Sequence, residues 1–349
     1  MEFLIAGDST LVVRFGNEIS EEINQKVRAF RIATEKHDVK GLIELIPTYC
    51  TVYVVYDPLV TDTDSIIKDL KAIGEEASEA VLPEPNIVEV PVAYGGEEGP
   101  DIENVAKAHD LTVDEVIKRH SGTDYLVYML GFTPGFTFCG GLGDDLATPR
   151  IKDPRLKVPA GSVGIAGKQT GLYAISSPGG WQLIGRTTMR FYNPELEPPC
   201  PVKAGDYLRF VPISAEEFEK NRKNVEAADN PPDYSNWNPE GEVVFNVVTP
   251  GALSSIQDKG RYGYQELGIS ASGAMDELAF RLGNRIVGND DNAPALEITM
   301  IGPRLEVVRE TLVAVTGADL SFAVNGEPAP LYTAIKLHPG DNVSVQRCW

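Results

Sequence analysis

Hydrophobic and polar positions alternate at the start of the chain and then recur at helical spacing. Residues 11–15 place apolar side chains at every second position, as a strand with one buried face does, and residues 19–30 place them every three or four positions, as a helix does. The same patterns predict two more strands, a second helix and a closing strand at residues 42–46, 49–56, 66–73 and 87–92. This β-α-β-β-α-β order is typical of a ferredoxin-like layer, so we predict a ferredoxin-like α/β domain over residues 1–86.

A β-rich module is predicted over residues 87–215, and a short helix lies in its first part. That helix should begin after Thr112, because Glu115 follows three residues later as in a capping box, and it should end at His120. Apolar runs then predict strands at residues 125–130 and 206–211.

A charged helix or linker at residues 215–228 and a Pro/Asn-rich stretch at residues 230–241 come after this module. We interpret residues 216–242 as helix and linker, and the Pro/Asn-rich stretch as the best domain boundary in the chain. A second module is predicted over residues 243–349, with strands at residues 243–248, 296–298, 305–308 and 312–316. One helix in it has an apolar face that we interpret as core, made of Met275, Leu278, Leu282 and Ile286.

Glycines gather in the centre of the chain, at residues 129–186. Twelve of the 33 glycines lie between Gly131 and Gly185, among runs of Val, Ile and Leu. Glycine weakens strands and helices, so this density indicates a backbone that turns tightly or approaches a ligand closely. A Gly-rich β-barrel with ordinary turns is the alternative.

The charge of the chain separates this centre from the rest. The formal net charge is −20, which argues against nucleic acid and anionic membrane surfaces as partners. Residues 121–210 nevertheless carry nine Lys and Arg against seven Asp and Glu. A relatively basic centre favours an anionic substrate or nucleotide, although a barrel also has fewer of the glutamates that cover helix surfaces.

Other sequence features limit the class of protein. The 349 residues suggest two or three domains, and no apolar run is long enough for a membrane span. The chain shows no signal-peptide pattern and no CxxC pair among its four cysteines, so we expect a cytoplasmic protein without a bound metal. Neither a P-loop nor an HExxH motif is present, and the glycines at 161, 164 and 167 do not form a dinucleotide fingerprint.

Polar residues among the central glycines are the candidate chemistry. Lys157 and Arg186 can bind developing phosphate charge, and Gln169 and Gln182 can direct hydrogen bonds to an amide. His120 can carry a proton near neutral pH, or it can act only as a cation at its helix C-terminus. A Ser-His-Asp triad that pairs Ser162 with His120 is a weaker alternative.

The motifs at residues 94–96, 129–136, 148–150 and 158–186 resemble the B-type subunit of bacterial 5-oxoprolinase. That family has also been labelled allophanate hydrolase subunit 1 and the Kip inhibitor of a sporulation kinase. The last module resembles the start of the C-type subunit of the same enzyme, also labelled allophanate hydrolase subunit 2, in residues 250–251, 255–261 and 272–276. Paired modules of these two kinds make the carboxyltransferase domain of biotin-dependent urea carboxylase.

The resemblance implies an α+β protein. Its parts would be the ferredoxin-like domain, a cyclophilin-like β-barrel over residues 87–215 like carboxyltransferase subdomains C and D, and a partial second cyclophilin-like barrel module over residues 243–349 like subdomains A and B. Because the C-type polypeptide is normally two to three times longer than the matching segment, we predict that the second module is incomplete.

The resemblance also implies a reaction, the ATP-dependent opening of 5-oxo-L-proline to L-glutamate with a separate A-type subunit. ATP with Mg²⁺ would phosphorylate the lactam oxygen, and water would attack the activated carbon. Lys157 and Arg186 would bind phosphate, Gln169 and Gln182 the amide, and His120 would move a proton. A C-type partner or a second copy is a further expected partner. The expected substrate- and nucleotide-binding residues are Gly131, Phe132, Pro134, Gly135, Arg150, Pro159, Gly161, Ser162, Gly167, Gln257, Asp258 and Arg261.

Two other functions remain open. The first is the carboxyltransferase component of a urea carboxylase-like enzyme, which needs a biotin carrier whose Met-Lys-Met motif is absent from this sequence. The second is a non-catalytic histidine-kinase inhibitor of the Kip type, which needs only a binding surface.

Overall fold

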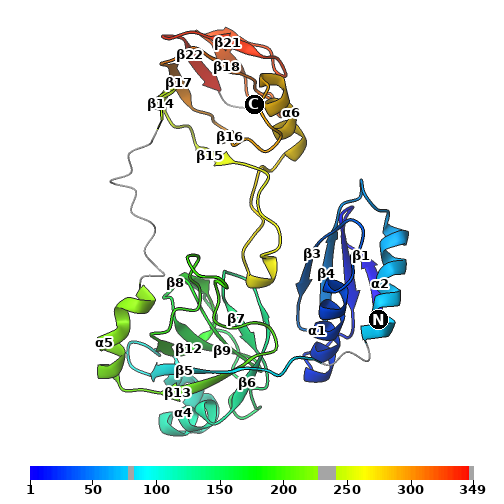
Figure 1. Ribbon diagram of the computed structural model, residues 1–349. Coiled ribbons are helices and arrows are strands. Elements are labelled where there is room, and N and C mark those ends of the chain that lie inside the picture. The colour runs from blue at the N-terminus through cyan, green and yellow to red at the C-terminus, as the bar shows by residue number, and fades with distance from the viewer. Residues whose placement is uncertain (78–81, 227–240, 346–349) are drawn as a thin grey trace. The chain divides into compact units, whose positions relative to one another are not determined.

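The computed structural model describes residues 1–77, 82–226 and 241–345 and shows a mixed α/β protein. The chain divides into two compact units (Figure 1). Unit 1 comprises Met1–Pro232 and Tyr262–Ser270, and unit 2 comprises Asp233–Arg261 and Ala271–Trp349. None of the described helices combines the length and the apolar character that crossing a bilayer requires.

The first part of unit 1 is a four-stranded antiparallel sheet with two helices on one face. The strands are β1 (Glu2–Ile5), β2 (Thr10–Arg14), β3 (Leu42–Pro47) and β4 (Thr51–Tyr56), in the order β1-β2-β4-β3. Helices α1 (Glu21–Glu35) and α2 (Thr63–Ala77) bury their apolar sides against the same sheet face. Val27 and Leu70, for example, share one core cluster with Val13 and Val54.

The predicted closing strand at residues 87–92 does not join this sheet. β1 pairs antiparallel with β2, Phe3 opposite Val13, and so fills the edge that the closing strand was expected to occupy. The strand β5 (Ile87–Tyr94) instead belongs to the barrel that comes next in the chain. Local periodicity identified the strand correctly, but the sheet to which it was assigned was wrong.

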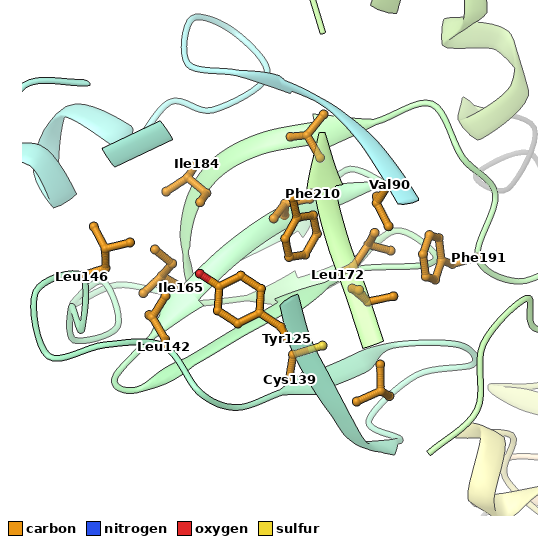
Figure 2. Close-up of a cluster of buried hydrophobic side chains, with 14 of the residues drawn as sticks. Val90, Tyr125, Cys139, Leu142, Leu146, Ile165, Leu172, Ile184, Phe191 and Phe210 are labelled. Atoms are coloured by element: carbon orange, nitrogen blue, oxygen red, sulfur yellow. The ribbon is translucent and has the colours of Figure 1, made fainter. Parts of the chain in front are cut away.

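The second part of unit 1 is a closed seven-stranded barrel in the order β10-β7-β6-β13-β5-β12-β9. Besides β5, its strands are β6 (Asp124–Leu130), β7 (Thr137–Cys139), β9 (Ser162–Ala166), β10 (Gln169–Leu172), β12 (Gln182–Thr187) and β13 (Tyr207–Pro212). β5 and β13 run parallel, and the other neighbouring strands run antiparallel. Figure 2 shows the side chains that fill its core, among them Val90, Tyr125, Ile165, Leu172 and Phe210.

Shorter elements surround the barrel. They are the helices α3 (Ile102–Ala108), α4 (Val113–Ser121) and α5 (Ala215–Glu226), and the strands β8 (Arg155–Val158) and β11 (Ser177–Gly179), which pair with each other. The capping box at Thr112 and Glu115 is confirmed, because each side chain bonds the backbone N–H of the other residue. α5 confirms the predicted helix up to Glu226, whereas residues 227–240, which hold most of the predicted linker, lie outside the described residues.

Unit 2 contains one five-stranded sheet, two strand pairs and one helix among the residues that the structure describes. The sheet has the order β14-β17-β22-β19-β20, and the pairs are β15-β16 and β18-β21. These elements are β14 (Phe245–Thr249), β15 (Leu253–Gln257), α6 (Glu277–Val287), β16 (Ala295–Thr299), β17 (Arg304–Val307), β18 (Thr311–Val313), β19 (Phe322–Val324), β20 (Glu327–Pro328), β21 (Ile335–Leu337) and β22 (Asn342–Val345).

The apolar face assigned to the core of this helix is mostly exposed. Met275, Leu278 and Leu282 keep 91, 70 and 37% of their surface in contact with solvent. The residues that α6 buries are instead Ala279, Phe280 and Asn284. The prediction was wrong because α6 is apolar on two faces, and the pattern does not say which of them has a neighbour.

Candidate functional site

Two of the sequence motifs meet at one end of the barrel. The Nε2 of Gln182, at the start of β12, donates a hydrogen bond to the carbonyl of Pro149 at 2.9 Å. The backbone N–H of Ile151 donates to the carbonyl of Gly180 at 2.8 Å. Thr148 forms a β-bridge with Gly167 in the turn between β9 and β10. Residues 148–151 are thereby held along the edge of residues 177–182.

The paired strands β8 and β11 extend this end of the barrel. Gly179 lies opposite Arg155, and the Arg155 guanidinium binds the carboxylate of Asp101 at 2.8 Å. That carboxylate also accepts the backbone N–H of Leu183 at 2.7 Å. Because Asp101 bonds both partners, β8 is fixed to β12.

A cationic surface results from the sequence of β8 and the residues before it. Arg150, Lys152 and Lys157 are exposed, and Arg155 is half-buried. Tyr173 lies beneath, and burial raises its pKa to about 12 although Arg150 and Arg155 act in the opposite direction. A Cβ at Gly179 would clash with the hydroxyl of Tyr173, so this glycine is required by the close approach of the strand. We call Arg150, Lys152, Arg155 and Lys157 the basic rim.

Two buried polar groups beside the basic rim have unused hydrogen-bonding capacity. Ser177 and Gln182 are each 8% exposed. The hydroxyl of Ser177 and the Oε1 of Gln182 have no hydrogen-bond partner within residues 1–77, 82–226 and 241–345. Buried polar atoms are normally paired, so these two are candidates for contacts with a ligand. The hydroxyl can donate or accept, and the amide oxygen can accept an N–H.

His120 lies in the barrel core and does not fit the proton-carrier interpretation. Its Nδ1 is bonded to the hydroxyl of Tyr94 and its Nε2 to the hydroxyl of Thr170, both at 2.8 Å. The ring stacks on Phe210 with centroids 4.6 Å apart. Burial lowers the pKa of His120 to about 3, so the ring is neutral and is also not a cation at its helix C-terminus. With both nitrogens occupied, it cannot act as the base for Ser162 either.

Arg186 is likewise enclosed by protein. Its Nε donates to the carbonyl of Ala160 at 2.7 Å, and its Nη1 lies 3.5 Å from the carboxylate of Glu98. Glu98 also binds Arg222 of α5, and both guanidinium groups lie over the ring of Phe218. Arg186, which was expected to bind phosphate, therefore connects the barrel to α5 in this structure.

The other residues predicted near β9 and β10 have mostly structural surroundings. The Nε2 of Gln169 donates to the hydroxyl of Tyr49 at 2.6 Å. Ser162 is buried where β9 pairs with β12. Gly161 has φ +82°, and a Cβ there would collide with the backbone carbonyl of Thr187 and press on Val225 of α5. Pro159, two residues earlier, is half-buried.

The loop that joins β6 and β7 contains four more predicted residues, Gly131, Phe132, Pro134 and Gly135. Phe132 is 63% exposed and has a left-handed backbone, φ +65°. The N–H of Gly135 donates to the carbonyl of Leu267 at 2.9 Å. Leu267 belongs to the 3₁₀-helix η1 (Gln265–Leu267), which the sequence analysis did not identify because three residues show no periodicity.

Three predicted binding residues belong to unit 2. Gln257 ends β15, its Nε2 bonding the hydroxyl of Ser255 at 3.0 Å. Asp258 accepts the N–H of Gly260 at 2.7 Å, and Arg261 has an exposed side chain. The structure therefore places Arg150 beside Gln182 and Tyr173, and adds Ser177 and Arg155. Lys157 precedes Val158, the residue that pairs with Ser177. The cluster of four cations within residues 150–157 is the signal that would have found Arg155.

Comparison with known proteins identifies the family. The family model for the carboxyltransferase domain, subdomain C and D, matches residues 1–202, and the model for subdomain A and B matches residues 267–348. The B-type subunit of 5-oxoprolinase from Bacillus subtilis is 44% identical over 222 residues, which cover 61% of this chain and 92% of that protein. The chain belongs to the carboxyltransferase subdomain C and D family.

Two further relatives match beyond the C and D part. The C-type subunit of 5-oxoprolinase from Escherichia coli is 43% identical over 104 residues, which cover 30% of this chain and 34% of that protein. The crystal structure of TTHA0988 has a TM-score of 0.82 and 32% identity, and the match covers 97% of this chain and 66% of that one. This carboxyltransferase-family chain thus joins a B-type part to a part similar to about a third of the C-type polypeptide.

Proposed function

We propose that this chain is a cytoplasmic component of an ATP-dependent 5-oxoprolinase that opens 5-oxo-L-proline to L-glutamate together with a separate A-type subunit. The similarity to the B-type protein over nearly its whole length supports the proposal. The observation that carries it is the meeting of residues 148–151 and 177–182 at the barrel end, where the basic rim lies beside two buried polar groups with free capacity.

The chemistry of the proposed site follows from these groups. Lys157 and Arg150 bind the negative charge of ATP·Mg²⁺ and of the phosphorylated lactam oxygen. The Oε1 of Gln182 accepts the lactam N–H, and the hydroxyl of Ser177 donates to the substrate carboxylate. Water then attacks the activated carbon, and the ring C–N bond breaks as the nitrogen takes up a proton and becomes the α-amino group. A second water hydrolyses the resulting γ-glutamyl phosphate to L-glutamate and phosphate. His120 and Arg186 hold the barrel and α5 in place.

A reconstitution assay tests this proposal. The full chain is combined with the A-type protein and a full-length C-type protein, and glutamate is measured after addition of 5-oxoproline and ATP. Lys157→Ala should lower kcat/KM about 100-fold or more, because it removes a charge from the transferring phosphate. Lys168→Ala is the control, because Lys168 is equally cationic and exposed but binds Asp144. Equal rates for the two variants would contradict the assignment.

We further propose the finer description of the fold. The first sheet is a ferredoxin-like layer in which β1 replaces the last strand, the barrel is cyclophilin-like, and unit 2 is part of a second such module. The strand orders and the family models support this description.

Carboxyl transfer is the second candidate function, because both family models describe subdomains of carboxyltransferases. Carboxylated biotin, a candidate acceptor amide and the full chain would be incubated together, and loss of carboxybiotin measured. Turnover in this assay with none in the glutamate assay would favour the second function over the first.

A further inference from the structure

We propose that Tyr262–Ser270, here called the arm, is the docking element by which a C-type polypeptide binds a B-type unit. The arm is a loop of the C-type part of the sequence, and its base is closed by a hydrogen bond from the N–H of Arg261 to the carbonyl of Ala271 at 2.8 Å. The compact body to which the arm belongs is nevertheless unit 1. This inference concerns assembly and does not depend on the reaction.

The arm satisfies a buried carboxylate of the first sheet. Glu44 of β3 is 6% exposed. Its two oxygens accept the backbone N–H of Gln265 at 2.7 Å and the side-chain Nε2 of Gln265 at 2.8 Å. A buried carboxylate is costly unless it is hydrogen-bonded, so Glu44 and Gln265 are complementary. Arg31 of α1 adds an ion pair with Glu266 at 2.8 Å.

The other side of the arm contacts the barrel. Leu267 packs against the barrel core, and Ile269 is buried. The carbonyl of Leu267 accepts the N–H of Gly135 in the loop between β6 and β7. The arm therefore combines apolar anchors with a buried polar clamp and an ion pair, and it joins the first sheet to the barrel. A recognition element of this kind concentrates binding energy in few residues.

One position in the arm excludes any side chain. Gly268 has φ +79°, and a Cβ there would collide with the backbone carbonyl of Thr133. Gly263, in the same arm, has a similar φ of +88° but nothing within 4 Å of the position of a Cβ. The two glycines share the backbone strain that an alanine would suffer, and they differ in the contact with unit 1.

The occupant of this docking site is the arm of a C-type chain. The residues that the arm contacts match the subdomain C and D model, since Arg31, Glu44 and Gly135 lie within residues 1–202. The subdomain A and B match begins at residue 267, inside the arm. The B-type and C-type relatives are separate proteins, so in them the same two surfaces would meet as two chains.

Cleavage of the folded chain tests the arm. A specific protease site is inserted within residues 227–240 of the full-length protein, the purified protein is cut, and the two pieces are followed by size-exclusion chromatography over a dilution series. The cut wild-type pieces should stay together at micromolar concentration. Gly268→Ala should raise the Kd between the pieces about tenfold or more, and Gly263→Ala should change it less than about threefold.

A second measurement distinguishes weaker docking of the arm from a general loss of stability in the Gly268→Ala variant. Hydrogen exchange in the uncut protein should show loss of protection at the Gly135 amide in Gly268→Ala and in Glu44→Ala, with the Val127 amide in β6 still protected. Separation of the cut wild-type pieces, or equal behaviour of the two glycine variants in both measurements, would overturn the proposal.

Discussion

In the barrel of unit 1, inward side chains meet a closed core, whereas in unit 2 side chains of the same kinds lie open to solvent. The barrel core includes Leu172 and Ile165, both without exposed surface. In unit 2 the buried apolar cluster is small, made of Val307, Phe322, Leu337, Val343 and Val345. Exposed apolar residues lie on several of its elements, namely Val247, Leu253, Ile256, Met275, Leu278, Leu296 and Leu312.

Unit 2 also has a pocket. It has a volume of about 670 Å³, is open to solvent, and lies between α6 and the strands, where apolar side chains such as Phe280, Ile298 and Val343 form part of its lining. The comparison teaches that similar strand patterns in the sequence do not show whether a core closes over them.

The largest expected effect is on the free energy of unfolding, when a leucine is replaced by alanine in each of the two units. Leu172→Ala in the barrel core should lower the free energy of unfolding by about 4 kcal/mol, because it leaves a cavity. Leu278→Ala on α6 should change it by less than about 0.5 kcal/mol, because that side chain is exposed. Urea unfolding followed by circular dichroism measures both. Equal losses would show that the exposed face of α6 is covered in solution.

A second pair of variants compares buried and exposed ion pairs. Arg186→Ala should lower the free energy of unfolding by about 3 kcal/mol, because Glu98 keeps only Arg222 and the carbonyl of Ala160 loses its partner. Arg285→Ala removes an exposed pair with Asp291 and should have no measurable effect. Thermal melting checks both. If Arg186→Ala keeps full stability but loses turnover, Arg186 contacts a reacting group after all.

The last expected effect is a pH dependence that unit 1 should show because of His120. Its pKa is about 3 in the folded protein and about 6.5 when unfolded, so between these values the unfolded chain binds the extra proton. Stability is therefore complete above about pH 6.5 and falls as the pH is lowered, by up to about 1.4 kcal/mol per unit.

Two histidine variants test this slope. His120→Gln, which keeps hydrogen-bonding capacity, should reduce the loss of stability between pH 6.5 and 4. His338→Gln is the control, because His338 is exposed in unit 2. Urea midpoints measured across this range decide the matter, and an unchanged slope in His120→Gln would contradict the assignment.

The sequence predicted most elements of unit 1 because their signals are local. The capping box at Thr112, the helix from Ala215 and the strands β2, β3 and β4 of the first sheet all depend on neighbours within a few residues. The assignment of β5 failed because periodicity identifies a strand but not the free edge that it joins. The exposed face of α6 was assigned to the core for the same reason, since the pattern does not show which face of a helix packs against another element.

The candidate site shows a similar limit. A dense glycine motif was interpreted as ligand-binding, yet Gly161 is required by its positive φ and by the close approach of the Thr187 carbonyl and of Val225, which lie far along the chain. Arg186 and His120 carry the right chemistry, but their partners Glu98, Tyr94 and Thr170 come from distant strands and loops. The basic rim was more accessible to sequence reasoning, because its four cations are close neighbours along the chain.

The parallel pair formed by β5 and β13 also determines the order in which unit 1 can be completed during synthesis. Tyr207 pairs with Ile87 across 120 positions, so the barrel cannot close before residue 212 has left the ribosome. The first sheet has no such delay, because β1 fills its edge and its last strand ends at Tyr56. A nascent chain can thus fold its first sheet while β5 waits for β12, whose Gly185 pairs with Tyr94 across 91 positions, and then for β13.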